Sequence, residues 1–249
     1  MRINRFRALW AYLNAFWYLK IQRKMPKIYN GDTQHIAANT LKSNLRIVSK
    51  KSDLPAHPIA QYRWGIGLNL GNPKSDMLIE PINAVLKANL VDVNKLRVLS
   101  IGPRSLGELL NLEAHGFNRK NITGVDLFSI NERILVADMH KLPFVDDYFD
   151  VVICGWVLSY SDQKEKAVAE IVRVLKNEGI CSIGASYSPD SNDEQIRDRG
   201  YLIGSEIKIK NTQDIEKLFG KKLNKIYFRV DPDRLDRHCQ IVFTASVLK

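Results

Sequence analysis

Three short groups of residues in the middle of the chain combine types that can hold a nucleotide-type ligand. Gly102 follows an apolar run and opens a turn into a helical segment, so that backbone N–H groups at the helix start can face a carboxylate or phosphate. Asp126 follows the next apolar run, 24 residues later, where a carboxylate can accept hydrogen bonds from both hydroxyls of a ribose. Asp138-Met139 follows a third short run. Each group alone is weak evidence, because a strand-end Asp is often only a helix cap; their order and spacing together predict one binding site.

The surrounding sequence predicts the elements that must bring these groups together. From Leu96 onward, short β-rich runs alternate with helical segments, which predicts βαβ units and a mainly parallel sheet. We predict strands at 97–101, 122–126, 134–137, 150–155, 179–186, 224–230 and 239–247, and helices at 76–90, 105–116, 162–176 and 212–219. Ligands bind outside the carboxyl ends of the strands in such a sheet, where the three groups fall. Residues 231–237 are too few for a crossover helix, so the last two strands should form an antiparallel hairpin at the sheet edge.

Length and composition favour one large α/β domain with an extension. The 249 residues can bury a core without disulfides or metals, and 45% hydrophobic and 26% charged residues are ordinary globular values. We place a basic, aromatic-rich extension or lid at 1–60 and the α/β domain at 61–249. The three cysteines, Cys154, Cys181 and Cys239, have no spacing typical of a metal site, so we expect buried thiols in a reducing compartment.

The net charge of +10 lies entirely at the N-terminus. Residues 1–52 contain eleven Lys or Arg and one acid, Asp32, while the remaining residues contain 26 basic and 26 acidic side chains. Such an arm attracts anions, here RNA phosphates or acidic lipid headgroups. The alternative is a solvated basic face with no dedicated partner, and the sequence does not choose between them.

Aromatic and aliphatic residues recur at helical spacing near the start of the chain, predicting a helix at about 5–24 that ends before Pro26. An apolar stripe most often docks on a core, which favours a helix that covers the site; a membrane-surface helix is the alternative. The apolar stretch 8–19 is too short to span a bilayer, and no small-residue cleavage site follows it. We therefore predict a cytoplasmic protein without a transmembrane segment. Peripheral membrane association is one alternative, and an organellar presequence is another, because the first 31 residues contain several Arg and no acid.

The order of these motifs resembles one known family, the class I S-adenosylmethionine-dependent methyltransferases, in particular the branch with small-molecule, lipid and glycan substrates. The matching blocks cover about half of the chain: VLSIG (98–102), GVDL (124–127), ADMHKLPF (137–144), FDVVICGWVL (149–158) and EIVRVLKNEG (170–179). The resemblance implies a Rossmann-like methyltransferase fold, with a mainly parallel seven-stranded sheet and a C-terminal antiparallel hairpin, and S-adenosylmethionine as cofactor.

The resemblance also implies roles for individual residues. Asp126 would hold the ribose, Asp138 would accept a hydrogen bond from the adenine amino group, and Met139 would pack beside the ring, as suits a carboxylate and a thioether. Gly155 and Trp156 would border the methyl-transfer position. The complete set of cofactor-binding residues that we predict is Gly102, Pro103, Arg104, Asp126, Leu127, Asp138, Met139, Gly155 and Trp156.

The turn itself departs from the family pattern. The family usually has an acid near the start and two or three closely spaced glycines, whereas Ser100 replaces the acid here and Arg104 and Leu106 occupy later glycine positions. The central glycine of a dinucleotide motif admits a pyrophosphate, and Arg104 stands in its place, which disfavours NAD. Arg104 could bond the methionine carboxylate of S-adenosylmethionine in bidentate fashion, or be a structural or solvent-facing side chain.

The sequence leaves the acceptor and any catalytic base open. We predict methyl transfer to an oxygen or nitrogen of a small-molecule or sugar-containing acceptor, with the acceptor wall at 156–161. Candidate bases are His140, Tyr160, Asp162 and His238, each more often structural than catalytic. One alternative is a non-catalytic methyltransferase-like binding module. The other is an RNA methyltransferase guided by the basic arm, although no acceptor motif such as N-P-P-Y follows the fourth strand.

Overall fold

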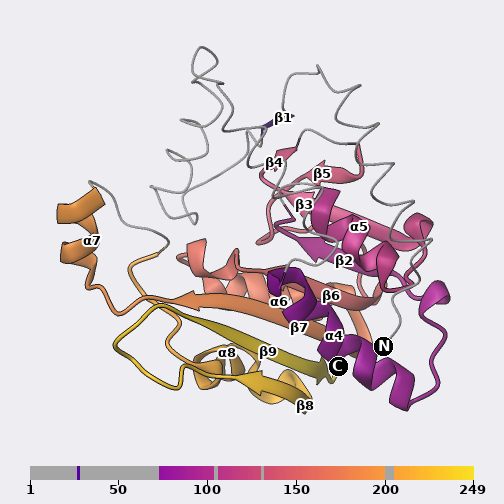
Figure 1. Ribbon diagram of the computed structural model, residues 1–249. Helices are drawn as coiled ribbons and strands as arrows, with labels where there is room; N and C mark the ends of the chain where they lie inside the picture. Colours follow the sequence, from indigo (N-terminus) through magenta and orange to yellow (C-terminus); the bar gives the residue numbers. More distant parts are fainter. Residues whose placement is uncertain (1–26, 29–72, 104–105, 130–131, 200–204) are drawn as a thin grey trace.

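The computed structural model describes residues 27–28, 73–103, 106–129, 132–199 and 205–249, and its centre is a seven-stranded sheet (Figure 1). The strand order is β5-β3-β2-β6-β7-β9-β8. The strands of this sheet are β2 (Val98–Ile101), β3 (Ile122–Asp126), β5 (Ile134–Val136), β6 (Phe149–Gly155), β7 (Leu175–Tyr187), β8 (Leu223–Val230) and β9 (Cys239–Val247). The helices are α4 (Pro73–Ala88), α5 (Leu106–Ala114), α6 (Lys164–Val174), α7 (Asn192–Arg199) and α8 (Thr212–Phe219). Short 3₁₀ turns lie at Val93–Lys95, Arg119–Asn121, Leu158–Tyr160 and Gly220–Lys222.

The sequence-based prediction of the sheet is confirmed. β5, β3, β2, β6 and β7 pair in parallel, and each predicted strand and helix from residue 73 onward has its counterpart within a few residues. The predicted C-terminal hairpin is also confirmed, because β8 and β9 pair antiparallel. β9 lies between β7 and β8, so the last strand of the chain is internal and β8 forms the sheet edge.

Alternating side chains give the sheet two buried faces. In β6, Val151 and Ile153 contact the cluster under α4 and α5, while Val152 and Cys154 contact the cluster under α6 and α8. Both faces are therefore covered by helices, and the central strands are apolar nearly throughout, as expected for a parallel sheet. Cys154 and Cys181 are fully buried free thiols and Cys239 is a partly buried one, which confirms the expectation of unpaired cysteines.

Three short elements, two strands and a helix, were not predicted. β1 (Lys27–Ile28) pairs antiparallel with β4 (Phe128–Ser129), which begins two residues after Asp126. α7 follows β7 and stands away from the sheet (Figure 1). The predicted N-terminal helix at 5–24, most of the extension and Arg104 lie outside the described residues. None of the helices in the described part of the chain is long and apolar enough to cross a membrane.

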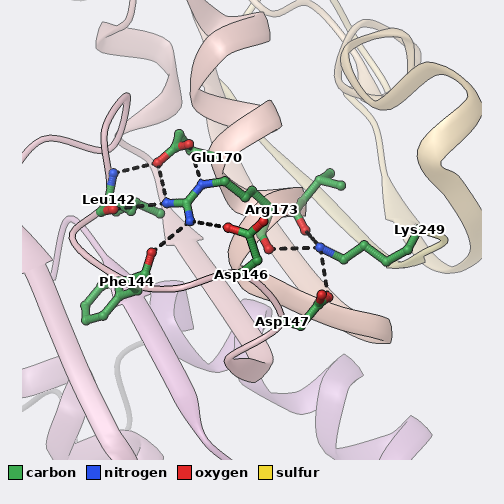
Figure 2. A network of polar contacts seen from close by, with 8 residues as sticks. Leu142, Phe144, Asp146, Asp147, Glu170, Arg173 and Lys249 are labelled. Atoms are coloured by element: carbon green, nitrogen blue, oxygen red, sulfur yellow. Dashed lines mark hydrogen bonds and ion pairs between the residues drawn. The ribbon is translucent and has the colours of Figure 1, made fainter.

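A polar network fixes the connection between β5 and β6 (Figure 2). The Arg173 guanidinium of α6 donates to the carbonyl oxygens of Leu142 and Phe144 at 3.0 and 2.8 Å, and to the carboxylates of Glu170 and Asp146. Glu170 in turn accepts from the Leu142 backbone N–H at 2.7 Å. These contacts give the segments 142–144 and 170–173 a structural role, because they hold the connection that carries Asp138 and Met139.

Replacing Arg173 with methionine should lower the free energy of unfolding by about 2–4 kcal/mol, because several charge-assisted hydrogen bonds are lost and the Glu170 carboxylate keeps no guanidinium. A melting temperature about 5–10 °C lower is the corresponding expectation for a domain of this size. Arg234→Met, which removes an exposed pair with Asp236, is the control and should change the melting temperature little. Equal melting temperatures for the two variants would show that the network contributes nothing.

Candidate functional site

The predicted site residues converge on one edge of the sheet. Gly102, Asp126 and Gly155 lie at the ends of β2, β3 and β6, and Asp138 follows the end of β5. These four strands are neighbours, and their registers align the ends: Ile101 is level with Val125 and Cys154. The structure therefore places at one carboxyl edge the groups that the sequence analysis selected from separate segments, as an open α/β sheet requires.

Gly102 makes the turn after β2 in a conformation that only glycine adopts readily. Its φ is +77°, and its N–H donates to the Val125 carbonyl oxygen at 2.8 Å. A Cβ on Gly102 would lie 2.1 Å from a methyl carbon of Val157, which follows β6. Pro103, predicted to contact the cofactor, is buried and packs against Gly124 of β3. The turn is thus held between the ends of β3 and β6.

Glu108 was missed by the sequence analysis. It lies in the first turn of α5, and its carboxylate accepts a hydrogen bond from the Ser100 hydroxyl of β2. A Cβ on Gly155 would come within 2.9 Å of the other carboxylate oxygen, so a side chain at position 155 would force the Glu108 carboxyl to shift. An acid in the first turn of an apolar helix directly after the Gly102 turn was the available signal.

The surroundings of Glu108 disfavour its charge. Burial raises the pKa of Glu108 to about 7, the Ser100 hydroxyl opposes this shift, and the negative charge of Asp126 adds to it. α5 is held on α4 by Asn111, whose side-chain amide donates to Ser75 and Asp76 at 2.7 Å each. The helix that carries Glu108 is therefore fixed independently of any ligand.

Asp126 lies at the end of β3 with a partly exposed side chain, followed by the partly exposed Leu127. Its backbone carbonyl accepts from the Ala137 N–H at 3.0 Å, which ties the end of β3 to the residue before Asp138. A carboxylate at this strand end can accept hydrogen bonds from paired hydroxyl groups, and the ribose contact of Asp126 stays a prediction.

Asp138 lies in a buried network with His140 and Ser161. The Asp138 carboxylate oxygen Oδ1 accepts from the His140 backbone N–H at 2.9 Å and lies 2.7 Å from His140 Nδ1. His140 Nε2 lies 2.6 Å from Ser161 Oγ, which itself accepts from the Gln163 N–H. His140 Nδ1 faces the Asp138 carboxylate and Nε2 faces the Ser161 hydroxyl, so both ring nitrogens are engaged within the protein.

The order Ser–His–Asp is that of a hydrolase triad, but the Ser161 side chain has no exposed surface, so no external substrate reaches its hydroxyl. The network instead orients the Asp138 carboxylate, and Met139, partly buried, packs against the core beside it. Because both ring nitrogens of His140 are engaged within the protein, the structural interpretation of this base candidate is favoured over the catalytic one.

Trp156 packs over the last residues of β7 and the start of β9. Its φ is +61°, and its indole packs on Gly184 while the indole N–H donates to the Gln240 side chain at 2.5 Å. Lys74 at the start of α4 lies 5.4 Å from the ring centroid. A left-handed backbone at a large aromatic residue is held only by such surroundings. Trp156 therefore borders the edge next to Gly155, and its role at the methyl-transfer position stays a prediction.

The other base candidates lie at the same edge but are less enclosed. Tyr160 is partly buried in the turn Leu158–Tyr160, and Asp162 is exposed. His238 lies in the exposed connection between β8 and β9, 3.6 Å from Asp190 beyond the end of β7. None of these contacts identifies a catalytic base. Among the described residues, no group of three or more His, Cys, Asp or Glu side chains is arranged to hold a metal ion.

Comparison with known proteins agrees with this geometry. Residues 101–183 match the family model described as "Methyltransferase domain". A ubiquinone/menaquinone biosynthesis C-methyltransferase of Stutzerimonas stutzeri is 49% identical over 49 residues, which cover 20% of this chain and 19% of that protein. An uncharacterized protein of Methanocaldococcus jannaschii is 30% identical over 122 residues, or 49% of this chain and 47% of that protein. The chain thus spans about a fifth and about half of the length of these two relatives.

A solved structure has a similar fold. The 1,6-didemethyltoxoflavin-N1-methyltransferase of Burkholderia thailandensis, determined with its substrate and S-adenosylhomocysteine, aligns with a TM-score of 0.51 and 19% sequence identity over 91% of this chain and 100% of that one. The matched family segment begins at Ile101 and ends within β7, so it contains Gly102, Asp126, Asp138 and Gly155. The residues that the structure gathers at one edge are those of the matched segment.

Proposed function

We propose, from the premise that this chain carries a class I S-adenosylmethionine-dependent methyltransferase domain, that it transfers a methyl group from this cofactor to a small-molecule acceptor. The observation that carries the proposal is the convergence of Gly102, Asp126 and Asp138 at the ends of β2, β3 and β5, inside the segment that matches the methyltransferase family. S-adenosylmethionine is the cofactor of this class.

The residues at this edge fit the chemistry of that cofactor. Asp126 offers a partly exposed carboxylate for two ribose hydroxyls. Asp138, held by His140, is the candidate acceptor for the adenine amino group, with Met139 beside the ring. Gly102 keeps side-chain atoms out of the turn after β2. Leu127, Pro103, Gly155, Trp156 and Arg104 complete the predicted contact set, with Arg104 outside the described residues.

When bound, the cofactor supplies a methyl group already activated by a positive sulfur, for in-line displacement by the acceptor. The protein must then align the acceptor behind the methyl group and exclude water. Trp156, fixed by Gly184 and Gln240, forms one wall beside Gly155, and the following residues to Ser161 form the rest of the proposed acceptor side. We assign no base, since His140 is engaged on both nitrogens.

We propose an oxygen or nitrogen of a small or sugar-containing molecule as the acceptor. The N1-methyltransferase named above acts on a small heterocycle, which supports a small acceptor, whereas the quinone-pathway relative is named as a C-methyltransferase and leaves carbon as the competing acceptor atom. A cytoplasmic location and the role of residues 1–60 as a lid belong to the same proposal. The lid is supported by the pairing of β1 with β4, two residues beyond Asp126.

The proposal is tested by calorimetric titration of the purified chain with S-adenosylmethionine and S-adenosylhomocysteine, followed by incubation with labelled cofactor and a metabolite extract. We expect saturable binding of both compounds and transfer of label to a small-molecule product. Binding without any transfer would identify a non-catalytic binding module instead. Absence of binding would overturn the proposal.

The basic arm suggests an RNA methyltransferase as the competing function. Under that function, binding of RNA would weaken steeply with salt and disappear when residues 1–52 are deleted, and the label would appear in RNA. Our proposal is supported if the label appears in a small molecule and if methyl transfer by the protein lacking residues 1–52 does not depend on the salt concentration.

A further inference from the structure

The position at which the family usually carries an acid is occupied here by Ser100, and another carboxylate lies beside it. Ser100 is fully buried in β2, and its hydroxyl donates to the Glu108 carboxylate of α5. An aspartate side chain at position 100 would reach into the same space. The two residues are eight apart in sequence, and α5 brings the carboxyl back over the strand that precedes it.

The Glu108 carboxyl lies directly beside the backbone of Gly155. Gly155 at the end of β6 has no side chain, and a Cβ there would meet Glu108 Oε2 at 2.9 Å and Leu78 of α4 at 3.7 Å. The partly buried Glu108 carboxyl thus lies between β2, β6 and α4, level with the ends of the strands where the proposed cofactor site begins. Gly155 was predicted to border the cofactor, and the structure shows Glu108 directly beside it.

The charged neighbours of Glu108 do not stabilise its ionised form. The negative charge of Asp126 on β3 raises the pKa of Glu108. On β6, the Glu108 charge in turn contributes to the raised pKa of the Cys154 thiol. The neighbour on α4 is the apolar Leu78. The part of the chain that the structure describes offers Glu108 no cationic partner. A partly buried acid without a cationic partner lowers the stability of the fold. Residues that lower stability in this way are found mainly at functional sites.

We infer that Glu108 replaces the missing acid of the turn and binds, as a carboxylate, the positive charge on the methionine half of S-adenosylmethionine. The inference rests on the proposed function and names one binding residue within it. It also couples cofactor binding to pH. Since the pKa of Glu108 in the unliganded protein is raised to about 7, the binding-competent ionised form is the minor one below pH 7.

Titration of wild type and Glu108→Gln with S-adenosylmethionine and S-adenosylhomocysteine at pH 6 and pH 8 tests this. Wild-type affinity should be about tenfold lower at pH 6, where about a tenth of the carboxyl is ionised. Glu108→Gln should bind at least tenfold more weakly at pH 8 and lose this part of the pH dependence. If Glu108→Gln loses affinity only for S-adenosylmethionine, the carboxylate contacts the sulfonium, which S-adenosylhomocysteine lacks. If it loses affinity for both ligands, the carboxylate contacts the ammonium group that both carry.

A second variant separates charge from architecture. In Ser100→Asp/Glu108→Gln the acid moves to the strand position, and we expect affinity at pH 8 to return to within about threefold of wild type, since the two side chains occupy adjoining space. Glu165→Gln, an exposed acid in the first turn of α6, is the control and should bind like wild type. A merely structural Glu108 would not be rescued by moving its charge.

Thermal unfolding without ligand gives an independent readout. The pKa of Glu108 is raised from its ordinary value of 4.5 to about 7 in the folded state, so the folded protein holds an extra proton in this window. Its contribution to stability is greatest below pH 4.5 and is lost as the pH rises through 7. Glu108→Gln should therefore melt several degrees above wild type at pH 8, with the difference shrinking towards pH 5.

The outcomes are distinguishable. If wild type binds neither compound, the proposed function fails and the inference with it. If wild type binds and Glu108→Gln binds equally well with the same pH profile, the proposed function stands and the role of Glu108 is refuted.

Discussion

Gly102→Ala is expected to lower the free energy of unfolding by about 2–6 kcal/mol, the combined cost of a left-handed backbone at a non-glycine residue and of overpacking against a fixed neighbour. The new Cβ would lie 2.1 Å from a Val157 methyl carbon, a separation that real Cβ atoms do not show, so the turn or the start of the segment after β6 must move. Denaturant unfolding of the purified variant measures the loss.

Gly220→Ala is a matched control for this prediction. Gly220 also has a positive φ, +53°, but a Cβ there meets no atom within 4 Å. It therefore carries only the backbone cost, about 1–3 kcal/mol. The difference between the two variants isolates the clash. Adding Val157→Ala to Gly102→Ala should recover part of the stability; equal losses at 102 and 220 would contradict the packing assigned to the turn.

Asp126→Asn is expected to reduce the affinity for S-adenosylmethionine and S-adenosylhomocysteine about 100-fold while leaving the fold intact. A carboxylate can accept hydrogen bonds from both ribose hydroxyls, whereas the asparagine amide presents an N–H₂ group to one of them. The loss of two charge-assisted hydrogen bonds, about 3 kcal/mol together, corresponds to this factor. Asp126 has a partly exposed side chain, so unfolding should change little.

Asp126→Asn also tests the electrostatic coupling between Asp126 and Glu108. Because the Asp126 charge contributes to the raised pKa of Glu108, its removal should move the pH dependence of the residual binding to lower pH. Asp236→Asn, an exposed acid in the connection between β8 and β9, is the control and should bind the cofactor normally. If Asp126→Asn binds S-adenosylmethionine with full affinity, Asp126 does not contact the cofactor, and the proposed position of the ribose loses its support.

The elements could be predicted from sequence because their signals are local. Apolar runs such as 149–155 and the alternating helical segments indicate a parallel sheet wherever they occur, and the short connection 231–237 excludes a crossover helix. The insertion of β9 between β7 and β8 was not predictable in this way. Pairing partners depend on contacts between whole strands, and both strands of a hairpin have similar local patterns.

The sequence by itself determined which residues stand at strand ends: Gly102, Asp126, Asp138 and Gly155 follow their strands by chain order alone, and parallel strands end at a common edge. Only the tertiary structure decided what those residues contact. The hydrogen bond between Ser100 and Glu108 and the one between His140 and Ser161 join different elements, and their existence depends on how the helices pack on the sheet. Burial, which raises the pKa of Glu108, is likewise a property of the packed molecule, so the role that we propose for this acid depends on the fold around it.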